Sequence, residues 1–274
     1  MRTSHTPPYK GSCGAQGGFF PPAGRSILPA LLLCVLFTLV ACARRTAYVR
    51  PDLSNPVFTV AVLPFYNASN DVEGPRLIRK EFFKRIQNRQ YSVMELEQSD
   101  ALLMDKMGIT LGSQLEMTTP EALGKVLGVD AVVYGFVLNF DDITTGVYNM
   151  KKVRAGFKLV DVRSGMVLWS RGLGVKAAVI GGAAGAGVTI LQELGDNGID
   201  EFSTINGIEG ISGLSDWHII RVIGTEKIGE AALFALSEKL LTTAFGVHLM
   251  AETSIMLNRV MPGFPAGPGR STPR

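Results

Sequence analysis

The chain has 274 residues, which is enough for one or two domains with a sizeable apolar core. Its net charge of +3 arises in the first 41 residues, which contain Arg2, Lys10 and Arg25 and no acidic residue, so that residues 42–274 carry equal numbers of basic and acidic side chains. This balance excludes a general electrostatic attraction to nucleic acid, and we predict no nucleic-acid partner.

Cysteine and histidine are too scarce for the usual metal sites. The chain has three cysteines, none of them beyond Cys42, and three histidines, of which His218 and His248 follow that position. A chain cut before Cys42 would keep one cysteine and could form no intramolecular disulfide. Because zinc prefers His and Cys ligands, we predict no metal site, and no motif indicates a cofactor.

The N-terminal segment is typical of an export signal. An apolar run of 14 residues spans 27–40, which is short of the roughly 20 residues that cross a bilayer as a helix. It ends in Leu39-Val40-Ala41-Cys42, a match to the bacterial lipobox. We predict that 1–41 is a signal peptide and that Cys42 carries a diacylglycerol, whose acyl chains (palmitate among them) anchor the protein. The alternative is an uncleaved membrane helix. Ala43, where an Asp would favour the inner membrane, favours the inner leaflet of the outer membrane, facing the periplasm.

Residues 42–56 resemble a tether, and the first expected core element is a strand at Val57–Phe65 that is apolar nearly throughout, as in a strand buried on both faces. Turn residues follow at 67–70. Helical spacing then predicts a helix over 76–89 with a basic outer face, and 91–96 is expected to be a short strand. The basic face contains Arg76, Arg79, Lys80, Lys84, Arg85 and Arg89. It is either a solvated face or a contact for anionic lipid headgroups or an acidic partner.

Cap residues mark the next helices. Ser99 is a candidate N-cap for a helix that ends at Gly108, and Thr119-Pro120 begins a helix that ends near Gly128. Residues 130–141 read as a buried strand. Residues 147–160 and 166–175 read as a hairpin joined by a glycine-bearing turn at 161–165, with Trp169 on the core.

The C-terminal part changes in composition. Residues 177–191 are apolar, glycine-rich and uncharged, 195–216 are expected to be a loop, 222–245 have helical spacing, and 262–274 are expected to be a disordered tail. Together these elements predict an α/β fold with a mixed β-sheet of about five strands flanked by helices and a long C-terminal helix, forming one domain over 57–250.

Three local patterns approach known chemistry without completing it. The glycines before Thr189 resemble a phosphate loop, but Val188 stands where the lysine is required, so close packing is favoured, with membrane or partner contact as the alternative. Asp141 and Asp142 point to opposite faces of a strand and are expected to be solvated. The cluster Ser215-Asp216-Trp217-His218 is local, whereas triad residues converge from distant segments.

A family resemblance runs through the segments VAVLPFYNAS (60–69), TPEALGKVLGVDAVVYGFV (119–137) and FKLVDVRSGMVLWS (157–170). They resemble a family of bacterial lipoproteins of uncharacterised function that includes a neisserial surface-antigen candidate, over roughly 57–250. More distantly, the layout is similar to the curli-secretion lipoprotein, the lipoprotein activators of penicillin-binding proteins and the N-terminal domain of the Tol translocation protein. The resemblance implies an α/β interaction or assembly module and carries no catalytic residues.

The main functional hypothesis is a lipid-anchored periplasmic module that assists or regulates an envelope machine for export or cell-wall assembly, with an envelope protein partner and no enzymatic activity. One alternative is a ring- or pore-forming secretion subunit, a homo-oligomer, for which 147–175 is the only candidate membrane hairpin. A second alternative is an envelope hydrolase, which would require a Ser, an Asp and a His brought together by the fold.

Overall fold

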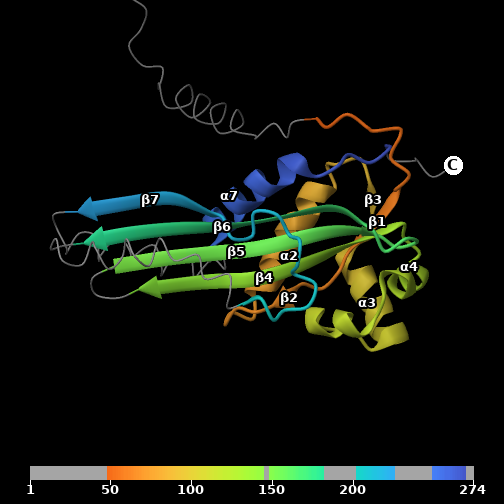
Figure 1. The fold of residues 1–274 in the computed structure, drawn as a ribbon, viewed down its shortest axis with the longest axis horizontal. Coiled ribbons are helices and arrows are strands. Elements are labelled where there is room, and N and C mark those ends of the chain that lie inside the picture. The colour runs from red at the N-terminus through yellow and green to blue at the C-terminus, as the bar shows by residue number, and fades with distance from the viewer. Residues whose placement is uncertain (1–47, 145–147, 182–201, 226–248, 270–274) are drawn as a thin grey trace, which may run out of the picture. The chain divides into compact units, whose positions relative to one another are not determined.

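A mixed seven-stranded sheet forms the centre of the protein (Figure 1). The computed structural model describes residues 48–144, 148–181, 202–225 and 249–269. The chain separates into two units, Met1–Ala47 and Tyr48–Arg274, and every described residue belongs to the second. The strands lie in the order β3-β1-β4-β5-β6-β7, and β2 also pairs with β4. The predicted α/β class and mixed sheet are confirmed, with seven strands in place of about five.

The first half of the chain builds parallel pairs. β1 (Thr59–Val62) lies between β3 (Ser92–Val93) and β4 (Ala131–Thr144) and is parallel to both. β2 (Tyr66–Asn67) is a two-residue strand that the sequence did not indicate, and it pairs with β4 where β1 has ended. Parallel neighbours need long crossovers, which helices α2, α3 and α4 supply.

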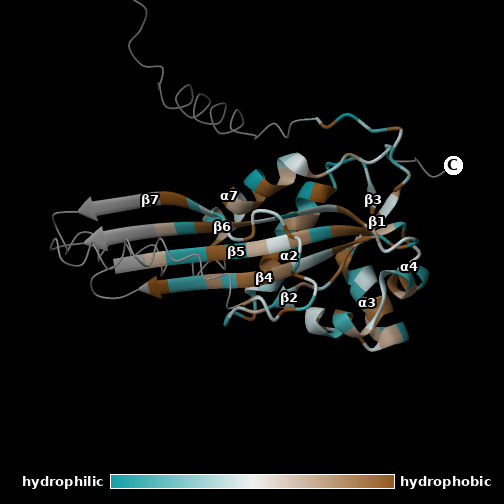
Figure 2. Cartoon of the chain, viewed as in Figure 1, coloured by the Kyte–Doolittle hydropathy of each residue, from teal (hydrophilic) through white to brown (hydrophobic). Residues whose placement is uncertain are grey.

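Both faces of β1 are buried, which explains its unbroken apolar sequence. Val60 and Val62 pack into one hydrophobic cluster, whereas Ala61 and Leu63 pack into a second on the opposite face. Figure 2 shows hydrophobic colour along β1 and mixed colour along the helices, as expected for helices buried on one side. The predicted strand is therefore confirmed at its centre.

The first cluster lies between the sheet and helices α2 (Gly74–Ile86) and α7 (Met250–Val260). Ile78 and Phe82 of α2 are fully buried, and the Phe82 ring stacks on Phe157 of β5 with centroids 4.6 Å apart. Val260 of α7 is also fully buried. The helix predicted over 76–89 corresponds to α2, which begins two residues earlier and ends three residues earlier than predicted.

The second cluster lies under α3 (Leu96–Met107), the 3-10 helix η1 (Gly112–Met117) and α4 (Pro120–Leu127). α4 has the predicted caps, because the Thr119 hydroxyl accepts the Ala122 N–H at 3.3 Å and Gly128 has a φ of 65°. α3 ends at Gly108 as predicted. It begins at Leu96, however, so Ser99 is an interior residue, with its hydroxyl donating to the Leu96 carbonyl.

The predicted hairpin is the middle of the sheet. β5 (Tyr148–Asp161) pairs antiparallel with β4 on one side and with β6 (Val167–Gly181) on the other. The turn between β5 and β6 has Gly165 at a φ of 68°, as its glycine suggested. Trp169 packs against the first cluster, as predicted.

The expectation of a helix over 222–245 is wrong at its start. β7 (Trp217–Thr225) runs parallel to β6, with Trp217 beside Gly174 and Thr225 beside Gly181. Pairing with β6 outweighs the local helical spacing, because Trp, Ile and Val suit a half-buried strand. Residues 226–245, most of the apolar segment 177–191 and the phosphate-loop-like stretch 182–189 lie outside the described residues. The C-terminal helix of the structure is α7, further along the chain.

The C-terminal segment departs from the expected disorder as far as residue 269. A 3-10 helix, η3 (Met261–Gly263), follows α7, and Phe264 is 2% exposed against the rings of Phe82, Tyr91 and Trp169. The Asp52 N–H donates to the Gly267 carbonyl at 2.9 Å, and Asn55 donates to the Ala266 carbonyl at 2.7 Å. Residues 48–56 of the expected tether are thus hydrogen-bonded to the C-terminal segment.

Within the described residues, no helix is both long enough and apolar enough to cross a membrane.

Candidate functional site

Four regions are candidates for function: the basic residues of α2, the end of the sheet near Asp130, and two pockets. Cys42, the predicted lipidation site, lies outside the described residues. No group of three or more His, Cys, Asp or Glu side chains suited to a metal ion occurs in the described part of the chain.

The six basic residues in and after α2 do not form one face. Arg79 is buried, and its guanidinium donates to the Val62 carbonyl at 2.7 Å, to the Ser99 hydroxyl at 3.2 Å and to both carboxylate oxygens of Asp100 at 2.7 and 2.8 Å. β3 pairs only with Thr59 and Val60 of β1, so the Val62 carbonyl lies beyond that pairing. Arg79 supplies its donor there.

Two further members of the set serve the fold. Arg85 donates to Glu81 at 2.9 Å and to the Ser254 hydroxyl of α7 at 3.0 Å, which joins the two helices. Arg89 donates to the carbonyls of Met261 and Phe264, and burial lowers its pKa. These residues hold the C-terminal segment in place.

The other three basic residues form an exposed stripe, which we call the α2 stripe: Arg76, Lys80 and Lys84, four residues apart. Arg76 lies 3.4 Å from Glu73, and Lys84 lies 2.6 Å from Glu81. The Arg76–Glu73 pair is exposed on both sides and adds little stability, whereas Lys84 pairs with a Glu81 side chain that is only 12% exposed. The charges of Arg76 and Lys80 therefore remain available to a partner, and Lys84 contributes from beside its carboxylate. The predicted six-residue surface thus reduces to three.

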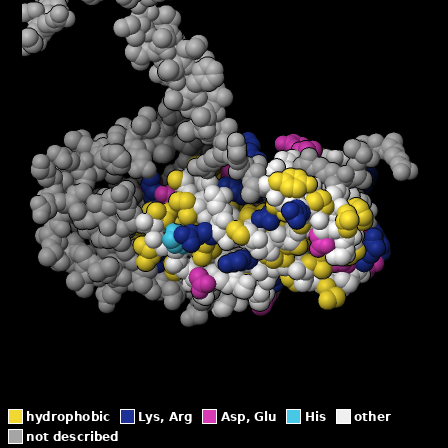
Figure 3. Space-filling model, turned by 90° about the horizontal axis from the view of Figure 1, so that it is seen from above, with side chains coloured by type: hydrophobic (Ala, Val, Ile, Leu, Met, Phe, Trp, Pro, Cys, Tyr) yellow, Lys and Arg dark blue, Asp and Glu magenta, His cyan; other side chains and the backbone are white. Residues whose placement is uncertain are grey.

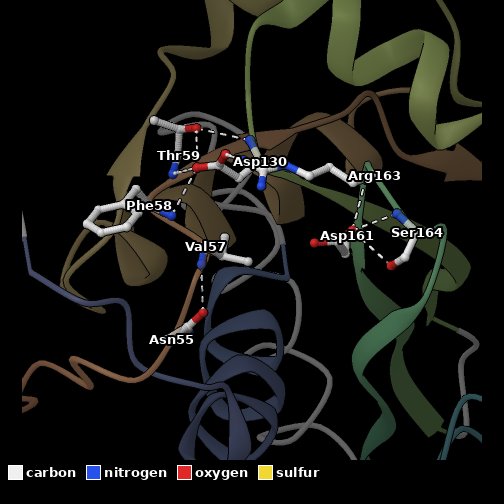
Figure 4. Close-up of polar contacts among 8 residues, drawn as sticks. All are labelled: Asn55, Val57, Phe58, Thr59, Asp130, Asp161, Arg163 and Ser164. Atoms are coloured by element: carbon white, nitrogen blue, oxygen red, sulfur yellow. Dashed lines mark hydrogen bonds and ion pairs between the residues drawn. The ribbon is translucent and has the colours of Figure 1, made fainter.

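The end of the sheet near Asp130 is a structural cluster (Figure 4). One carboxylate oxygen of Asp130 accepts the N–H groups of Phe58 and Thr59 at 3.0 Å and the Thr59 hydroxyl at 2.9 Å. The other accepts from Arg163 at 3.1 Å. Burial raises the pKa of Asp130, but the hydrogen bonds from Thr59 and Phe58 outweigh it and hold the pKa below its ordinary value. Asp130 therefore fastens the start of β1 to β4.

The turn beside this cluster is held in the same way. One oxygen of Asp161 accepts the N–H groups of Arg163 and Ser164 at 2.9 and 2.8 Å and the Ser164 hydroxyl at 2.9 Å (Figure 4). Backbone hydrogen bonding from Ser164 is the largest cause that lowers the pKa of Asp161. Asp130 and Asp161, which belong to the motif segments 119–137 and 157–170, therefore hold the backbone of the fold.

A pocket with an aromatic floor lies on the face of the sheet that carries η1. Tyr66, Tyr134 and Phe136 line it together with Met117, and its volume is about 450 Å³. Asn206 donates to Glu116 at 3.1 Å and connects η1 to the segment before β7. Burial raises the pKa of Tyr134 to about 12, so its hydroxyl stays protonated at neutral pH.

A second, polar pocket of about 650 Å³ lies between the start of β7, the middle of β6 and the end of α7; we call it the His218 pocket. Its polar and charged lining residues are Arg171, Ser212, Asp216, His218, Asn258 and Arg259. Figure 3 shows basic side chains beside a histidine on this face of the protein. Burial is the main cause that lowers the pKa of His218, with Arg259 as the second.

The His218 pocket brings together a Ser, an Asp and a His, the set that a hydrolase requires, but not in a catalytic arrangement. The Ser212 hydroxyl donates to the Ser170 carbonyl at 3.0 Å. Among the described residues, no hydrogen bond joins Ser212 to His218 or His218 to Asp216. The arrangement gives no base to the hydroxyl and no orienting carboxylate to the imidazole.

The ring of Trp217, at the start of β7, is in contact with two buried cations, Arg154 of β5 and Lys176 of β6. The guanidinium carbon of Arg154 is 3.9 Å from the centroid of the Trp217 ring, and the ammonium of Lys176 is 4.1 Å from it. Both cations are about 1% exposed. The ring packs against Gly174, where a Cβ atom would lie 2.3 Å from it. Sequence reasoning missed this arrangement, because it depends on the pairing of β7 with β6.

Solved structures offer several similar proteins. Lipoprotein GNA1162 from Neisseria meningitidis is 21% identical, with 54% of this chain and 99% of that chain covered at a TM-score of 0.42. The PelC dodecamer from Paraburkholderia phytofirmans is 14% identical, with 44% and 74% covered at 0.30. The LpoB C-terminal domain from Salmonella enterica is 16% identical, with 44% and 84% covered at 0.31. The comparison with curated protein sequences gave no match.

The family model that matches the chain is decisive for its assignment. It is described as GNA1162-like, and it covers residues 48–192, more than half of the chain. The match includes all three segments that carried the resemblance, and it begins at the first described residue, ahead of the expected start at 57. The chain therefore belongs to the GNA1162-like lipoprotein family.

Proposed function

We propose that this protein is an accessory lipoprotein of the bacterial cell envelope, anchored by lipid on Cys42, whose folded domain docks on an export or cell-wall machine. The observation that carries the proposal is the lipobox Leu39-Val40-Ala41-Cys42 directly upstream of a domain of the GNA1162-like lipoprotein family. Residues 1–41 are removed as the signal peptide, and Ala43 directs the protein to the inner leaflet of the outer membrane.

The tether in this proposal is short. Because Asp52 and Asn55 are hydrogen-bonded to the C-terminal segment, only residues 42–47 remain between the lipid and the described domain. Six extended residues reach at most about 20 Å, so the domain works close to the membrane surface. The α2 stripe, with Arg76, Lys80 and Lys84, is the surface that we propose for contact with anionic headgroups or with an acidic partner.

The anchor is tested by metabolic labelling with an alkyne fatty acid in a bacterial host, followed by separation of inner and outer membranes. The wild type is expected to carry the label in the outer-membrane fraction, and Cys42→Ser is expected to lose both label and membrane association. Cys34→Ser, in the same apolar run, is the matched control and keeps the label. A labelled Cys42→Ser protein would overturn the proposal.

The ring- or pore-forming alternative makes a different prediction for the mass of the detergent-extracted protein. Its only candidate membrane hairpin, 147–175, contributes β5 and β6, two inner strands that pair with β4 and β7, so its insertion in a membrane would dismantle the domain. We expect light scattering to give a monomer or dimer. A ring of many subunits that requires the lipid on Cys42 would replace the accessory role with the pore.

A further inference from the structure

The His218 pocket contains cationic groups that the fold does not use. Arg171 and Arg259 both line it and are exposed, and no hydrogen bond or ion pair engages either guanidinium in the described structure. Other arginines of the same domain, such as Arg79 and Arg85, are engaged by carboxylates and hydroxyls. Two guanidinium groups that no carboxylate of the described residues engages therefore line the same cavity.

The groups around these arginines add hydrogen-bond donors. Asn258, on α7 next to Arg259, accepts from Arg85 through its carbonyl oxygen at 3.3 Å, so its amide NH₂ is left to donate. His218 lines the same cavity from β7. The donors come from β6, β7 and α7, so three separate elements converge on one volume.

The charge of the lining favours an anion. The charged residues that line the pocket with His218 are Arg171 on β6, Asp216 in the segment before β7, and Arg259 on α7, whose charge acts on the imidazole. With a neutral imidazole, two arginines oppose one carboxylate, and protonation of His218 adds a further positive charge. A volume of about 650 Å³ lies within the range of roughly 300–1,000 Å³ that is usual for small-molecule sites.

We propose that the His218 pocket is a binding site for an anionic solute or headgroup, whose carboxylate or phosphate group is held by Arg171 and Arg259 with His218 as a third donor. Guanidinium groups bind such oxyanions in two-point geometry. The bound anion stabilises the imidazolium, so binding raises the pKa of His218, which burial and Arg259 hold low in the free protein. This site does not depend on the proposed docking function, because the α2 stripe lies on another helix.

The test is a histidine titration of the full lipidated chain in detergent micelles, with ¹³C-labelled histidine followed by NMR, in the presence of inorganic phosphate or acetate. We expect either anion to raise the pKa of His218 saturably, with a Kd below roughly 10 mM. The variant Arg171→Gln/Arg259→Gln is expected to weaken this effect at least tenfold.

The matched control is Arg76→Gln/Lys80→Gln, which removes the same charge from the α2 stripe and is expected to leave the anion response unchanged. Equal responses from the pocket variant and the wild type, or no saturable response from a folded wild type, would overturn the proposal. Nanodiscs identify the source of the anion. A raised His218 pKa in phosphatidylglycerol nanodiscs, absent from phosphatidylcholine, assigns the site to a lipid headgroup, whereas a response to phosphate alone assigns it to a solute.

Discussion

At the scale of single residues, some charged side chains hydrogen-bond main-chain groups that the sheet leaves unpaired, and others face solvent. Arg79 and Asp130 belong to the first kind, since each satisfies main-chain groups that no strand reaches. Lys80, adjacent to Arg79 in sequence, belongs to the second. An unpaired buried main-chain group costs about 1–3 kcal/mol, so the two kinds should differ sharply on mutation.

Arg79→Ala is expected to lower the free energy of unfolding by roughly 2–3 kcal/mol, because the Val62 carbonyl and the Ser99 hydroxyl lose their donor. The half-exposed Asp100 contributes less to this loss, since solvent screens its charge. Lys80→Ala, on the same helix, is expected to stay within about 0.5 kcal/mol. Urea unfolding of both variants checks this, and equal midpoints would contradict the assigned role of Arg79.

Asp130→Ala is expected to destabilise the fold by roughly 2–3 kcal/mol at neutral pH, since three donors of Phe58 and Thr59 lose a charged acceptor. The folded pKa of Asp130 lies below its ordinary value of 3.8, so its contribution is complete above that pH and is lost as the pH falls through the folded value.

Unfolding curves at neutral pH and below pH 4 measure this dependence as the difference between wild type and Asp130→Ala. That difference should narrow under the more acidic condition. Arg163→Gln serves as the control, because its side chain is 76% exposed and the loss of the ion pair should cost no more than about 1 kcal/mol. A difference that is independent of pH would show that the Asp130 carboxylate is not the stabilising group.

At the scale of elements, helices α4 and α2 meet the rest of the fold in different ways. α4 approaches the chain just after β5 through Gly124, where a Cβ atom would lie 2.5 Å from Val162 Cβ. The absence of a side chain there decides how closely this helix packs. α2 meets the sheet through buried Ile78, Phe82 and Phe83 and leaves the α2 stripe outside.

Gly124→Ala is expected to destabilise the protein by about 1–3 kcal/mol, although alanine is the better helix former by about 1 kcal/mol. The reason is overlap with the Cβ and Cγ atoms of Val162. Val162→Gly removes those atoms, so a double-mutant cycle by urea unfolding should show coupling between the two sites. Additive effects would mean that the contact is not what limits the approach of α4.

Charge reversal on the α2 stripe, Lys80→Glu/Lys84→Glu, is expected to weaken binding of the Cys42→Ser protein to phosphatidylglycerol vesicles at least tenfold, since each basic residue near an anionic surface contributes about 1 kcal/mol. The reversal Lys106→Glu/Lys125→Glu, on α3 and α4, is the matched control. Co-sedimentation measures the vesicle binding of both variants. An equal loss of binding in the two would show that the α2 stripe acts only through the net charge of the protein.

Local sequence signals predicted these elements where one signal dominated. The apolar run at β1, the Thr119–Pro120 start of α4 and the glycine after β5 all match the structure. β7 could not be predicted in this way, because its strand conformation comes from β6, distant in sequence. The basic face of the α2 helix was overestimated, since helical spacing cannot show which arginines find acceptors in other elements.

At the scale of the whole molecule, the core closes only when the C-terminal segment is in place. Phe264 is the centre of an aromatic group in which its ring lies 4.8 Å from Trp169, 5.9 Å from Phe82 and 6.0 Å from Tyr91. Arg89 holds the same segment from the end of α2. The composition of residues 262–274 predicted a disordered tail. This prediction fails as far as residue 269, because local composition cannot reveal a single anchoring aromatic residue such as Phe264.

Phe264→Ala is expected to cost about 3–5 kcal/mol, the usual range for removal of a fully buried Phe ring. The loss should also change the tryptophan fluorescence, since Trp169 loses its ring contact. Phe58→Ala, whose side chain is 49% exposed, is the control and should cost much less. Similar unfolding midpoints for the two variants would show that residues 262–269 do not complete the core.

The hydrogen bonds of Asp52 and Asn55 to the C-terminal segment also have a mechanical consequence. A pull on the proposed lipid anchor would enter the domain at residue 48. It would meet the bond from Gln90 to the Val49 carbonyl, and then those of Asp52 and Asn55 to Gly267 and Ala266, before it reaches β1. Tension on the proposed anchor would therefore first separate residues 48–55 from the C-terminal segment, which stays bound through Gly267 and Gly269 to the carbonyls of Arg89 and Gln90. The segment before β1 would thus take up the load first, and the strand pairing of the sheet would be reached only after these hydrogen bonds have broken.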